Sequence, residues 1–272
     1  MRAVRVTILA SGSAGNALVV ESAGARVLVD AGLPLKVLFA GLAEAFGAVP
    51  RFDAVIVTHA HGDHSAHAGR TAVALDAPLW LTQATKRCIR LPAEARTRVF
   101  GPRAPFDIGD LEVRPLGVPH DAPQVALVLD DGHARVALVT DLGEVPGGLV
   151  DHISNADVVL AESNHDLDML RRGPYPESLR RRIASREGHL SNTQCAELLG
   201  ALGPATKRVV LMHLSERNNR PDLARAQATE ALRGRDVRLD VAPPRGLVQL
   251  EVVRARPEAA TASARRQMTL PI

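Results

Sequence analysis

The sequence predicts an α/β protein in which two β-sheets pack together and helices cover their outer faces. Short runs rich in Val, Ile and Leu, each bounded by Gly, Pro, Asp or Ser, recur along the chain and are typical of buried strands. Strands follow one another directly at the start, whereas helical patterns alternate with strands later, as in a layered fold. The 272 residues are enough to bury the core of one such domain.

The individual elements follow from apolar periodicity and from turn residues. Strands are predicted at residues 4–9, 17–20, 25–29, 54–58, 111–118, 124–129, 134–140, 157–161, 207–212 and 246–253. Helices are predicted at residues 35–46, 66–75, 83–90, 147–154, 191–202 and 221–233. Residues 254–272 lose this periodicity and are rich in Ala, Arg, Pro and Thr, so we expect one domain at 1–253 and a flexible basic tail at 254–272.

Composition argues against a membrane or exported protein. No apolar run reaches the roughly 18 residues that a membrane span needs, and residues 1–10 are too short for a signal peptide. The two cysteines, Cys88 and Cys195, lie in predicted amphipathic helices, where we expect buried thiols and no disulfide framework. We therefore expect a cytoplasmic protein without a membrane partner.

The formal charge of +3 is carried by the predicted tail, so the rest of the chain is formally neutral. Within it, residues 171–186 form a basic stretch that opposes only Glu177. Its arginines are Arg171, Arg172, Arg180, Arg181, Arg182 and Arg186. This stretch could contact an anionic substrate, or it could be an ordinary solvated helix face.

The strongest chemical signal is a group of metal-ligand residues directly after a predicted strand. The strand at 54–58 is followed by the run His59-Ala-His61-Gly-Asp63-His64. A tight loop can turn these side chains toward one point, and imidazole with carboxylate is a ligand set that suits zinc. The alternative, histidines that only cap a helix, does not account for four potential ligands at this spacing.

Three further candidates follow predicted strands, namely His120, Asp141 and His213. Any one of them alone would more often be a polar strand end than a ligand. Their repetition at strand ends in a layered fold instead favours one shared site at a rim of the sheets.

Asp30, the 59–64 run, His120, Asp141 and His213 occur in the order found in the metallo-β-lactamase superfamily, which the chain resembles over nearly all of residues 1–253. The resemblance implies the metallo-β-lactamase αββα four-layer sandwich and two divalent metal ions, Zn²⁺ or alternatively Mn²⁺. It implies one ion on His59, His61 and His120, a second on Asp63, His64 and His213, and Asp141 between them. It also implies that Asp30 orients the ligand loop by hydrogen bonding; the alternative is an ordinary turn acid before Gly32.

Three more segments are similar to the YycJ/WalJ-type subfamily of 5′ to 3′ DNA exonucleases, and more distantly to tRNase Z and the carbon-phosphorus lyase phosphodiesterases. They are residues 11–16 (SGSAGN), 162–166 (ESNHD) and 188–192 (GHLSN) leading into 211–219. The likeness implies a phosphodiesterase whose nucleophile is a hydroxide between two metals.

The same likeness implies that Asp63, His189 and Glu162 are the catalytic residues. An imidazole held by a carboxylate is suited to protonate a leaving oxygen near neutral pH, so we expect His189 to be the general acid. The alternative is that His189 only packs at a helix N-terminus beside Ser191. His165 is expected near the site without an assigned role.

Polar residues after the last ligand could donate hydrogen bonds to a substrate phosphate, as could the backbone of residues 11–16. They are Ser215, Arg217, Asn218 and Asn219, and an ordinary polar loop would explain each as well. The chain departs from the subfamily at His67, where Gly is usual, and after Asp121, which leaves the shape of the pocket open. Aromatic residues make up only 3%, so we expect backbone contacts with DNA and low sequence specificity.

Two questions stay open at this point. The first is the substrate, because a small-molecule phosphodiesterase or a thioester or lactone hydrolase could use the same ligands; a groove along 171–186 would favour a polymer. The second is the end of the chain, residues 267–272 (QMTLPI), which is similar to the peptide that binds the bacterial sliding clamp. Gln267, Leu270 and Ile272 would make the contacts, unless these residues are only a frayed terminus.

Overall fold

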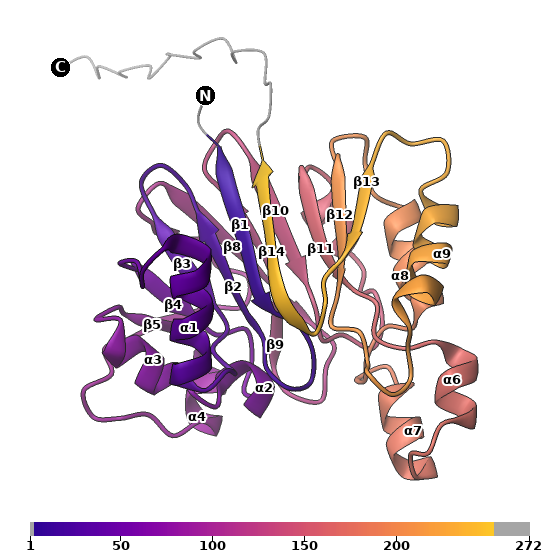
Figure 1. Ribbon diagram of the computed structural model, residues 1–272, viewed down its shortest axis with the longest axis horizontal. Coiled ribbons are helices and arrows are strands. Elements are labelled where there is room, and N and C mark those ends of the chain that lie inside the picture. Colours follow the sequence, from indigo (N-terminus) through magenta and orange to yellow (C-terminus); the bar gives the residue numbers. More distant parts are fainter. Residues whose placement is uncertain (1–2, 253–272) are drawn as a thin grey trace, which may run out of the picture.

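The computed structural model describes residues 3–252, and two seven-stranded β-sheets form its centre (Figure 1). The first sheet has the order β14-β1-β2-β3-β4-β5-β6. Its strands are β1 (Val4–Ala10), β2 (Ala17–Glu21), β3 (Arg26–Val29), β4 (Ala54–Ile56), β5 (Leu79–Thr82), β6 (Thr97–Phe100) and β14 (Arg245–Val252). Strands β3 to β6 are parallel, whereas β14, β1, β2 and β3 pair antiparallel.

The second sheet has the order β13-β12-β11-β10-β9-β8-β7. Its strands are β7 (Phe106–Ile108), β8 (Leu111–Val118), β9 (Gln124–Asp130), β10 (Arg135–Val139), β11 (Val158–Glu162), β12 (Arg208–Met212) and β13 (Arg238–Val241). Strands β10 to β13 are parallel, and β7, β8, β9 and β10 pair antiparallel. The carboxyl ends of β8, β10, β11 and β12 therefore lie at one edge of this sheet.

Helices cover the outer face of each sheet. In chain order, the helices of the described residues are α1 (Leu35–Phe46), α2 (Gly62–Ser65), α3 (Ala68–Ala74), α4 (Gln83–Cys88), α5 (Leu149–Ile153), α6 (Leu167–Arg172), α7 (Glu177–Ile183), α8 (Asn192–Gly200) and α9 (Pro221–Ala231). One apolar cluster joins α1 and α3 to the first sheet, and another joins α5, α8 and α9 to the second. A third fills the space between the sheets. The four layers confirm the predicted αββα sandwich.

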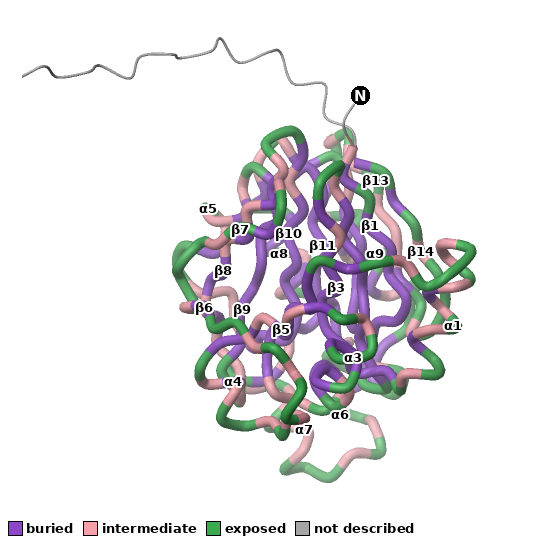
Figure 2. The backbone as a smooth tube through the Cα atoms, turned by 90° about the vertical axis from the view of Figure 1, so that its left-hand side faces the viewer, coloured by how far each residue is buried: buried purple, intermediate pink, exposed green. Residues whose placement is uncertain are grey.

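The central strands read as apolar runs because they are buried on both faces. Every residue of β9 and β11 is buried, and Figure 2 shows buried residues along the central strands, with exposed residues in the outer loops and helices. Within residues 3–252, none of the helices combines the length and the apolar character that crossing a membrane requires.

Every strand and helix predicted from periodicity is present, with ends shifted by a few residues. Strands β5, β6, β7 and β13 and helices α2, α6 and α7 were missed. Most of these are edge strands or short helices with few buried side chains, and α7 has none, so they carry no apolar period. One burial prediction was wrong, because Cys88 is exposed at the end of α4, whereas Cys195 is buried as expected.

Several predictions concern residues outside the described part of the chain. They are the domain end at 253, the tail 254–272, and the clamp contacts Gln267, Leu270 and Ile272. These assignments stay predictions.

Candidate metal and catalytic site

Loops at one edge of the two sheets bring all the predicted metal ligands together. The 59–64 run follows β4 and enters α2, while His120, Asp141 and His213 follow β8, β10 and β12. Asp30, Asp141 and His213 have left-handed backbone, with φ of 61°, 58° and 55°. Such a conformation is costly outside glycine and is found where the surrounding structure holds a functional side chain. Backbone strain is therefore present at the positions where these strands end and the site residues begin.

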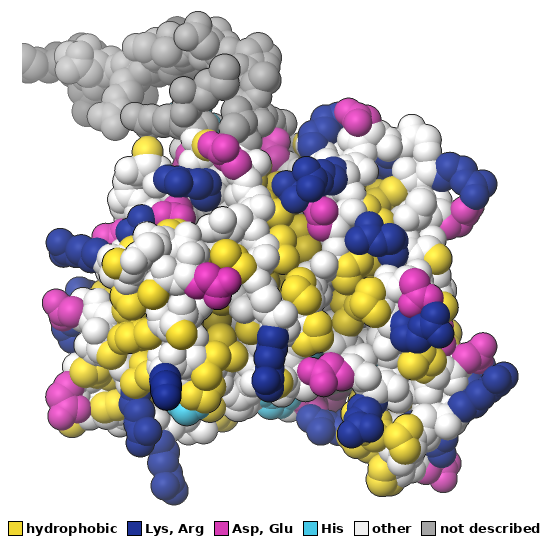
Figure 3. Space-filling view, viewed as in Figure 1, with side chains coloured by type: hydrophobic (Ala, Val, Ile, Leu, Met, Phe, Trp, Pro, Cys, Tyr) yellow, Lys and Arg dark blue, Asp and Glu magenta, His cyan; other side chains and the backbone are white. Residues whose placement is uncertain are grey.

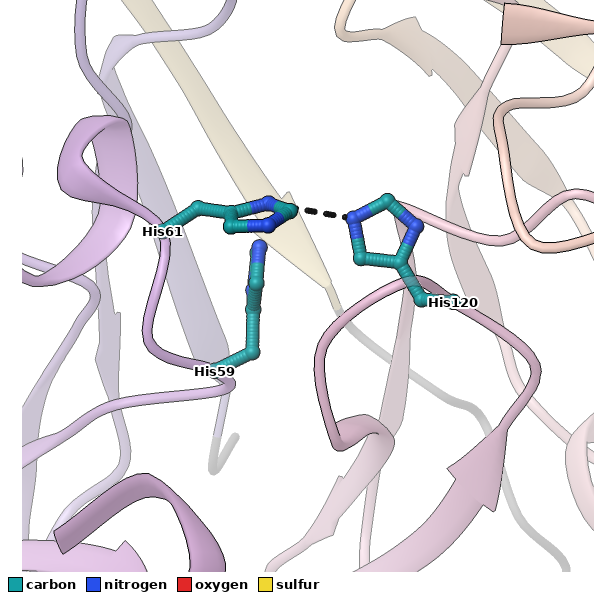
Figure 4. A group of neighbouring side chains, drawn as sticks. All are labelled: His59, His61 and His120. Carbon is teal, nitrogen blue, oxygen red and sulfur yellow. Dashed lines mark hydrogen bonds between the residues drawn. The ribbon is translucent and has the colours of Figure 1, made fainter. Parts of the chain in front are cut away.

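The first ligand set is His59, His61 and His120, whose rings converge from the two sheets (Figure 4). His61 Nδ1 lies 3.2 Å from His120 Nε2. His59 is fully buried, and its Nε2 has no hydrogen-bond partner in the described part of the chain. An unpaired buried polar atom is destabilising, and coordination of a cation would remove that cost. These three residues fit a metal ion.

The second ligand set is Asp63, His64 and His213. Asp63 Oδ2 lies 3.4 Å from Nε2 of both histidines. Asp141 lies beside this set, with Oδ2 3.2 Å from His64 Nε2 and Oδ1 3.6 Å from His213 Nε2, and it also groups with His59. Asp141 therefore adjoins both sets, which is the placement a shared ligand needs.

The protonation states of these residues also suit cation binding. Burial lowers the pKa of His59 and of His120, so both imidazoles are neutral, as metal ligands must be. Burial alone would also lower the pKa of His213, but Asp141 and then Asp63 and Glu162 raise it to about 10. Despite its burial, the pKa of Asp63 is lowered by His213 and His64. The carboxylates are thus anionic and stabilise the protonated form of neighbouring histidines. Bound divalent cations could take the place of those protons.

Asp30 supports the ligand loop without being part of either set. It is buried, and its Oδ2 lies 2.7 Å from His64 Nδ1. Its Oδ1 accepts a hydrogen bond from Thr58 N at 2.9 Å. Nearby, Gly32 packs so closely on the loop that a Cβ would lie 1.8 Å from the carbonyl oxygen of Asp63. Asp30 therefore fixes His64 with Nε2 facing Asp63, Asp141 and Asn16.

Several polar groups of the 11–16 segment, whose backbone was expected to offer hydrogen bonds to a phosphate, are used within the fold. Gly12 N donates to Asn16 Oδ1 at 2.8 Å, and Asn16 N donates to Asp63 O at 2.7 Å. Asn16 Nδ2 lies 2.9 Å from His64 Nε2, and Ser11 Oγ accepts from His213 N at 2.8 Å. The segment braces the ligands, a role that no local sequence pattern signalled.

Glu162 and His189 form the predicted pair at the edge of the second ligand set. Glu162 is fully buried at the end of β11, and its Oε1 lies 2.7 Å from His189 Nδ1 and 3.2 Å from His213 Nδ1. Burial raises the pKa of Glu162, but His189 outweighs it and lowers the pKa to about 2. Conversely, burial lowers the pKa of His189, while Glu162 raises it above the ordinary value. One carboxylate thus orients both a predicted ligand and the predicted acid.

Asn218 and Asn219 contradict the phosphate prediction, because both are buried. Asn219 Nδ2 donates to Asn192 Oδ1 at 2.8 Å, and Asn192 Nδ2 returns a hydrogen bond to Asn219 Oδ1 at 2.9 Å. The amide of Asn218 is buried beside Gly173, and neither its oxygen nor its nitrogen has a hydrogen-bond partner among the described residues. Burial is the physical reason for the error, since a polar loop in sequence can be an interior network in space. Ser215 and Arg217 are at least partly exposed and keep their candidate role.

His165 lies beneath the site, buried and with Nδ1 unpartnered in the described residues. Burial lowers the pKa of His165 to about 4. Its imidazole is therefore neutral near pH 7 and is not placed in either ligand set.

The basic stretch 171–186 lies mostly on α6 and α7, which project beyond the sheets near the site (Figure 1). Much of its charge is paired: Arg181 with Glu177, Arg182 with Asp121 and Arg186 with Glu144. Figure 3 shows Lys and Arg side chains scattered over this side of the molecule, with histidines visible toward its lower edge. The stretch is therefore less cationic than its sequence indicates.

The site is open to solvent on one side. The side chains of His61, Asp63 and His189 are 32%, 22% and 21% exposed, whereas those of His64, Asp141 and His213 are almost completely buried. A substrate could therefore approach the ligand sets from the face that carries His61 and His189.

Comparison with known proteins identifies one matching family and several relatives. Residues 25–214 match the family described as the beta-lactamase superfamily domain. Exodeoxyribonuclease WalJ of Streptococcus pneumoniae serotype 2 (strain D39 / NCTC 7466) is 35% identical over 246 residues, which cover 87% of this chain and 91% of WalJ. Exodeoxyribonuclease YycJ of Bacillus anthracis is 34% identical over 233 residues, covering 83% and 88%.

Solved structures share the fold at lower identity. The metallo-β-lactamase fold protein YhfI from Bacillus subtilis superposes with a TM-score of 0.71 at 21% identity, covering 92% of this chain and 100% of YhfI. Zn²⁺-bound PqqB from Methylobacterium extorquens gives a TM-score of 0.70 at 18% identity, covering 90% and 100%. At these identities the likeness concerns the fold alone.

Proposed function

Because this chain belongs to the metallo-β-lactamase superfamily, as a metal-dependent hydrolase of the YycJ/WalJ type, we propose that it is a 5′ to 3′ DNA exonuclease with two metal ions. The observation that carries the proposal is the Glu162–His189 pair beside two ligand sets that adjoin at Asp141. Relatives named exodeoxyribonucleases match most of the chain and favour DNA over other phosphodiesters.

His59, His61 and His120 would hold one ion and Asp63, His64 and His213 the other, with Asp141 shared. The histidine-rich set favours Zn²⁺, and Mn²⁺ is the alternative. When bound, such a pair supplies Lewis-acid activation of water and neutralises charge on a phosphodiester. The buried His59 Nε2 and the anionic Asp63 and Asp141 are the features that support this assignment.

The proton for the leaving oxygen would come from His189. Its Nδ1 faces Glu162, so Nε2 is the nitrogen left to donate a proton to substrate. Glu162 stays anionic and, against the effect of burial, raises the pKa of His189, which favours the protonated imidazole. The side chain is partly exposed and can therefore meet a bound strand.

Contacts with the DNA backbone would come from exposed basic side chains around the opening. Arg217 follows the last ligand strand, and His67 shares a surface hollow with Arg70 and Arg90 beside the metal loop. Such contacts bind phosphates without distinguishing bases, which predicts low sequence specificity.

A cytoplasmic DNA-repair role and binding of the sliding clamp through Gln267, Leu270 and Ile272 are part of the same proposal. The support is the sequence of residues 267–272 together with nuclease relatives. A short tethered peptide would raise the local concentration of the enzyme at DNA.

The deciding experiment incubates metal-loaded protein with 5′-phosphorylated single- and double-stranded DNA, RNA and bis(p-nitrophenyl) phosphate. We expect mononucleotides to appear first from the 5′ end of DNA, and Asp141→Asn to remove this activity. Hydrolysis of bis(p-nitrophenyl) phosphate with no cleavage of any DNA would instead favour a small-molecule phosphodiesterase and contradict the proposal.

A further inference from the structure

Asp121, directly after the ligand candidate His120, contacts two distant parts of the chain. Its Oδ1 lies 3.1 Å from His61 Nε2 and 3.4 Å from His120 Nε2. Its Oδ2 accepts a hydrogen bond from Arg182 Nε at 2.6 Å, and a second nitrogen of Arg182 completes the ion pair. A carboxylate thus links the first ligand set to helix α7.

The contact with His61 has a chemical consequence for metal binding. His61 presents Nδ1 toward His120 Nε2, so Nδ1 is the atom that faces the first set. A neutral imidazole that binds a cation through Nδ1 must carry its proton on Nε2. Asp121 Oδ1 is placed to accept that proton in a hydrogen bond. Asp30 contacts His64 through Nδ1, which leaves Nε2 of that ring for the second set, the reverse of the arrangement at His61. Each ligand set therefore has its own orienting carboxylate.

Arg182 holds Asp121 in the place that this contact requires. Arg182 occupies Asp121 Oδ2, which leaves Oδ1 to face His61 Nε2. The backbone is docked as well, because Asp121 N donates to Glu187 O at 3.0 Å and His120 Nδ1 lies 3.0 Å from Gly188 O. Residues 120–121 therefore rest on the segment that follows α7.

We propose that Asp121 is a positioning residue that fixes His61 for metal binding, and that Arg182 holds Asp121, which couples the basic helix α7 to the metal centre. The inference rests on the proposed ligand role of His61. Arg182 then differs in role from the neighbouring Arg181, which pairs with Glu177 within α7.

The test compares Asp121→Ala, Asp121→Asn, Arg182→Gln and the matched control Arg181→Gln. Affinity for Zn²⁺ is measured by chelator competition, and the ligand field is followed by the visible spectrum of Co²⁺. We expect Asp121→Ala to weaken binding of one ion about 10- to 100-fold, the range for a lost orienting partner. Asp121→Asn should lose less, because its amide oxygen can still accept from His61 Nε2.

Arg182→Gln should weaken the same ion, and combining it with Asp121→Ala should add nothing, because both changes break one linkage. Arg181→Gln removes an equal charge from α7 and should bind metal like the unmodified protein. Thermal unfolding of the metal-free proteins checks that each variant folds.

Unchanged affinity in Asp121→Ala would overturn the proposal, and so would equal losses in Arg181→Gln and Arg182→Gln, which would show a general charge effect. A loss in Asp121→Asn as large as in Asp121→Ala would make Asp121 a direct ligand and contradict its positioning role. These measurements contain no DNA, so they can succeed even where the proposed nuclease activity fails.

Discussion

The buried carboxylate of Glu162 lies 2.7 Å from Nδ1 of His189 and also contacts the predicted ligand His213. We therefore expect His189→Ala to keep both metals and to lower kcat on DNA about 10²- to 10⁴-fold, the usual scale for a lost general acid. Hydrolysis of bis(p-nitrophenyl) phosphate should fall much less, because nitrophenolate leaves without a proton. An equal loss on both substrates would speak against His189 as the acid.

The same pair predicts a shift in the pH profile. His189 donates only while protonated, so kcat on DNA should fall as pH rises through its pKa, which Glu162 raises above the ordinary value. In Glu162→Gln the charge is lost and this falling limb should move to lower pH. Steady-state kcat values measured across the pH range at saturating metal test this shift. A falling limb at the same pH in Glu162→Gln would contradict the assignment of His189 as the general acid.

The two ligand sets predict different metal contents. His59→Ala removes a ligand of the first set only, whereas Asp141→Asn alters the residue that adjoins both. We expect a lower metal-to-protein ratio in both variants, with the larger loss in Asp141→Asn, and loss of DNA hydrolysis in each. Elemental analysis after dialysis gives the ratios. Full occupancy with full activity in either variant would refute its ligand role.

The correction at Asn219 separates a structural residue from a candidate substrate contact. Asn219→Ala leaves the buried Nδ2 of Asn192 without its partner and should lower the free energy of unfolding by about 1–3 kcal/mol. Arg217→Ala should leave stability nearly unchanged, raise KM for DNA and reduce the slope of log affinity against log salt by about 1. Urea unfolding and DNA titrations test the two changes, and reversed effects would show that the residues were misassigned.

His165 predicts a pH dependence of stability. The pKa of the His165 imidazole is about 6.5 in the unfolded chain but about 4 in the folded protein. Below about pH 6.5 the unfolded chain therefore binds a proton that the folded protein does not, so the free energy of unfolding decreases as pH falls. Between pH 7 and pH 5 the loss should be about 2 kcal/mol in the unmodified protein. His165→Gln should lack that part of the decline in urea unfolding, and parallel declines would contradict the burial argument.

The terminal peptide gives a prediction that is independent of catalysis. If residues 267–272 bind the sliding clamp, Gln267→Ala with Leu270→Ala should abolish binding of the intact protein to purified clamp. Hydrolysis of bis(p-nitrophenyl) phosphate should be unaffected. No binding by the unmodified protein at high micromolar clamp in a calorimetric titration would end this idea.

The layered fold and the list of ligand candidates could both be predicted from the amino-acid sequence alone. Apolar runs mark strands buried on both faces, such as β9 and β11, and ligand types directly after β4, β8, β10 and β12 mark one rim. Both signals are local, because burial sets the side-chain pattern within a strand and a strand end sets the position of the next residue. Edge strands such as β6 and β13 escaped detection since exposure removes that pattern.

The polar residues that support the site, by contrast, could be identified only from the three-dimensional structure. Ser11 and His213 are 202 residues apart, and Asp121 and Arg182 are 61 apart, yet each pair is hydrogen bonded. Asn219 looks like a loop residue in sequence and is buried against Asn192 in space. Such contacts depend on how the two sheets and their loops close around the site, and residue order within one segment does not specify that geometry.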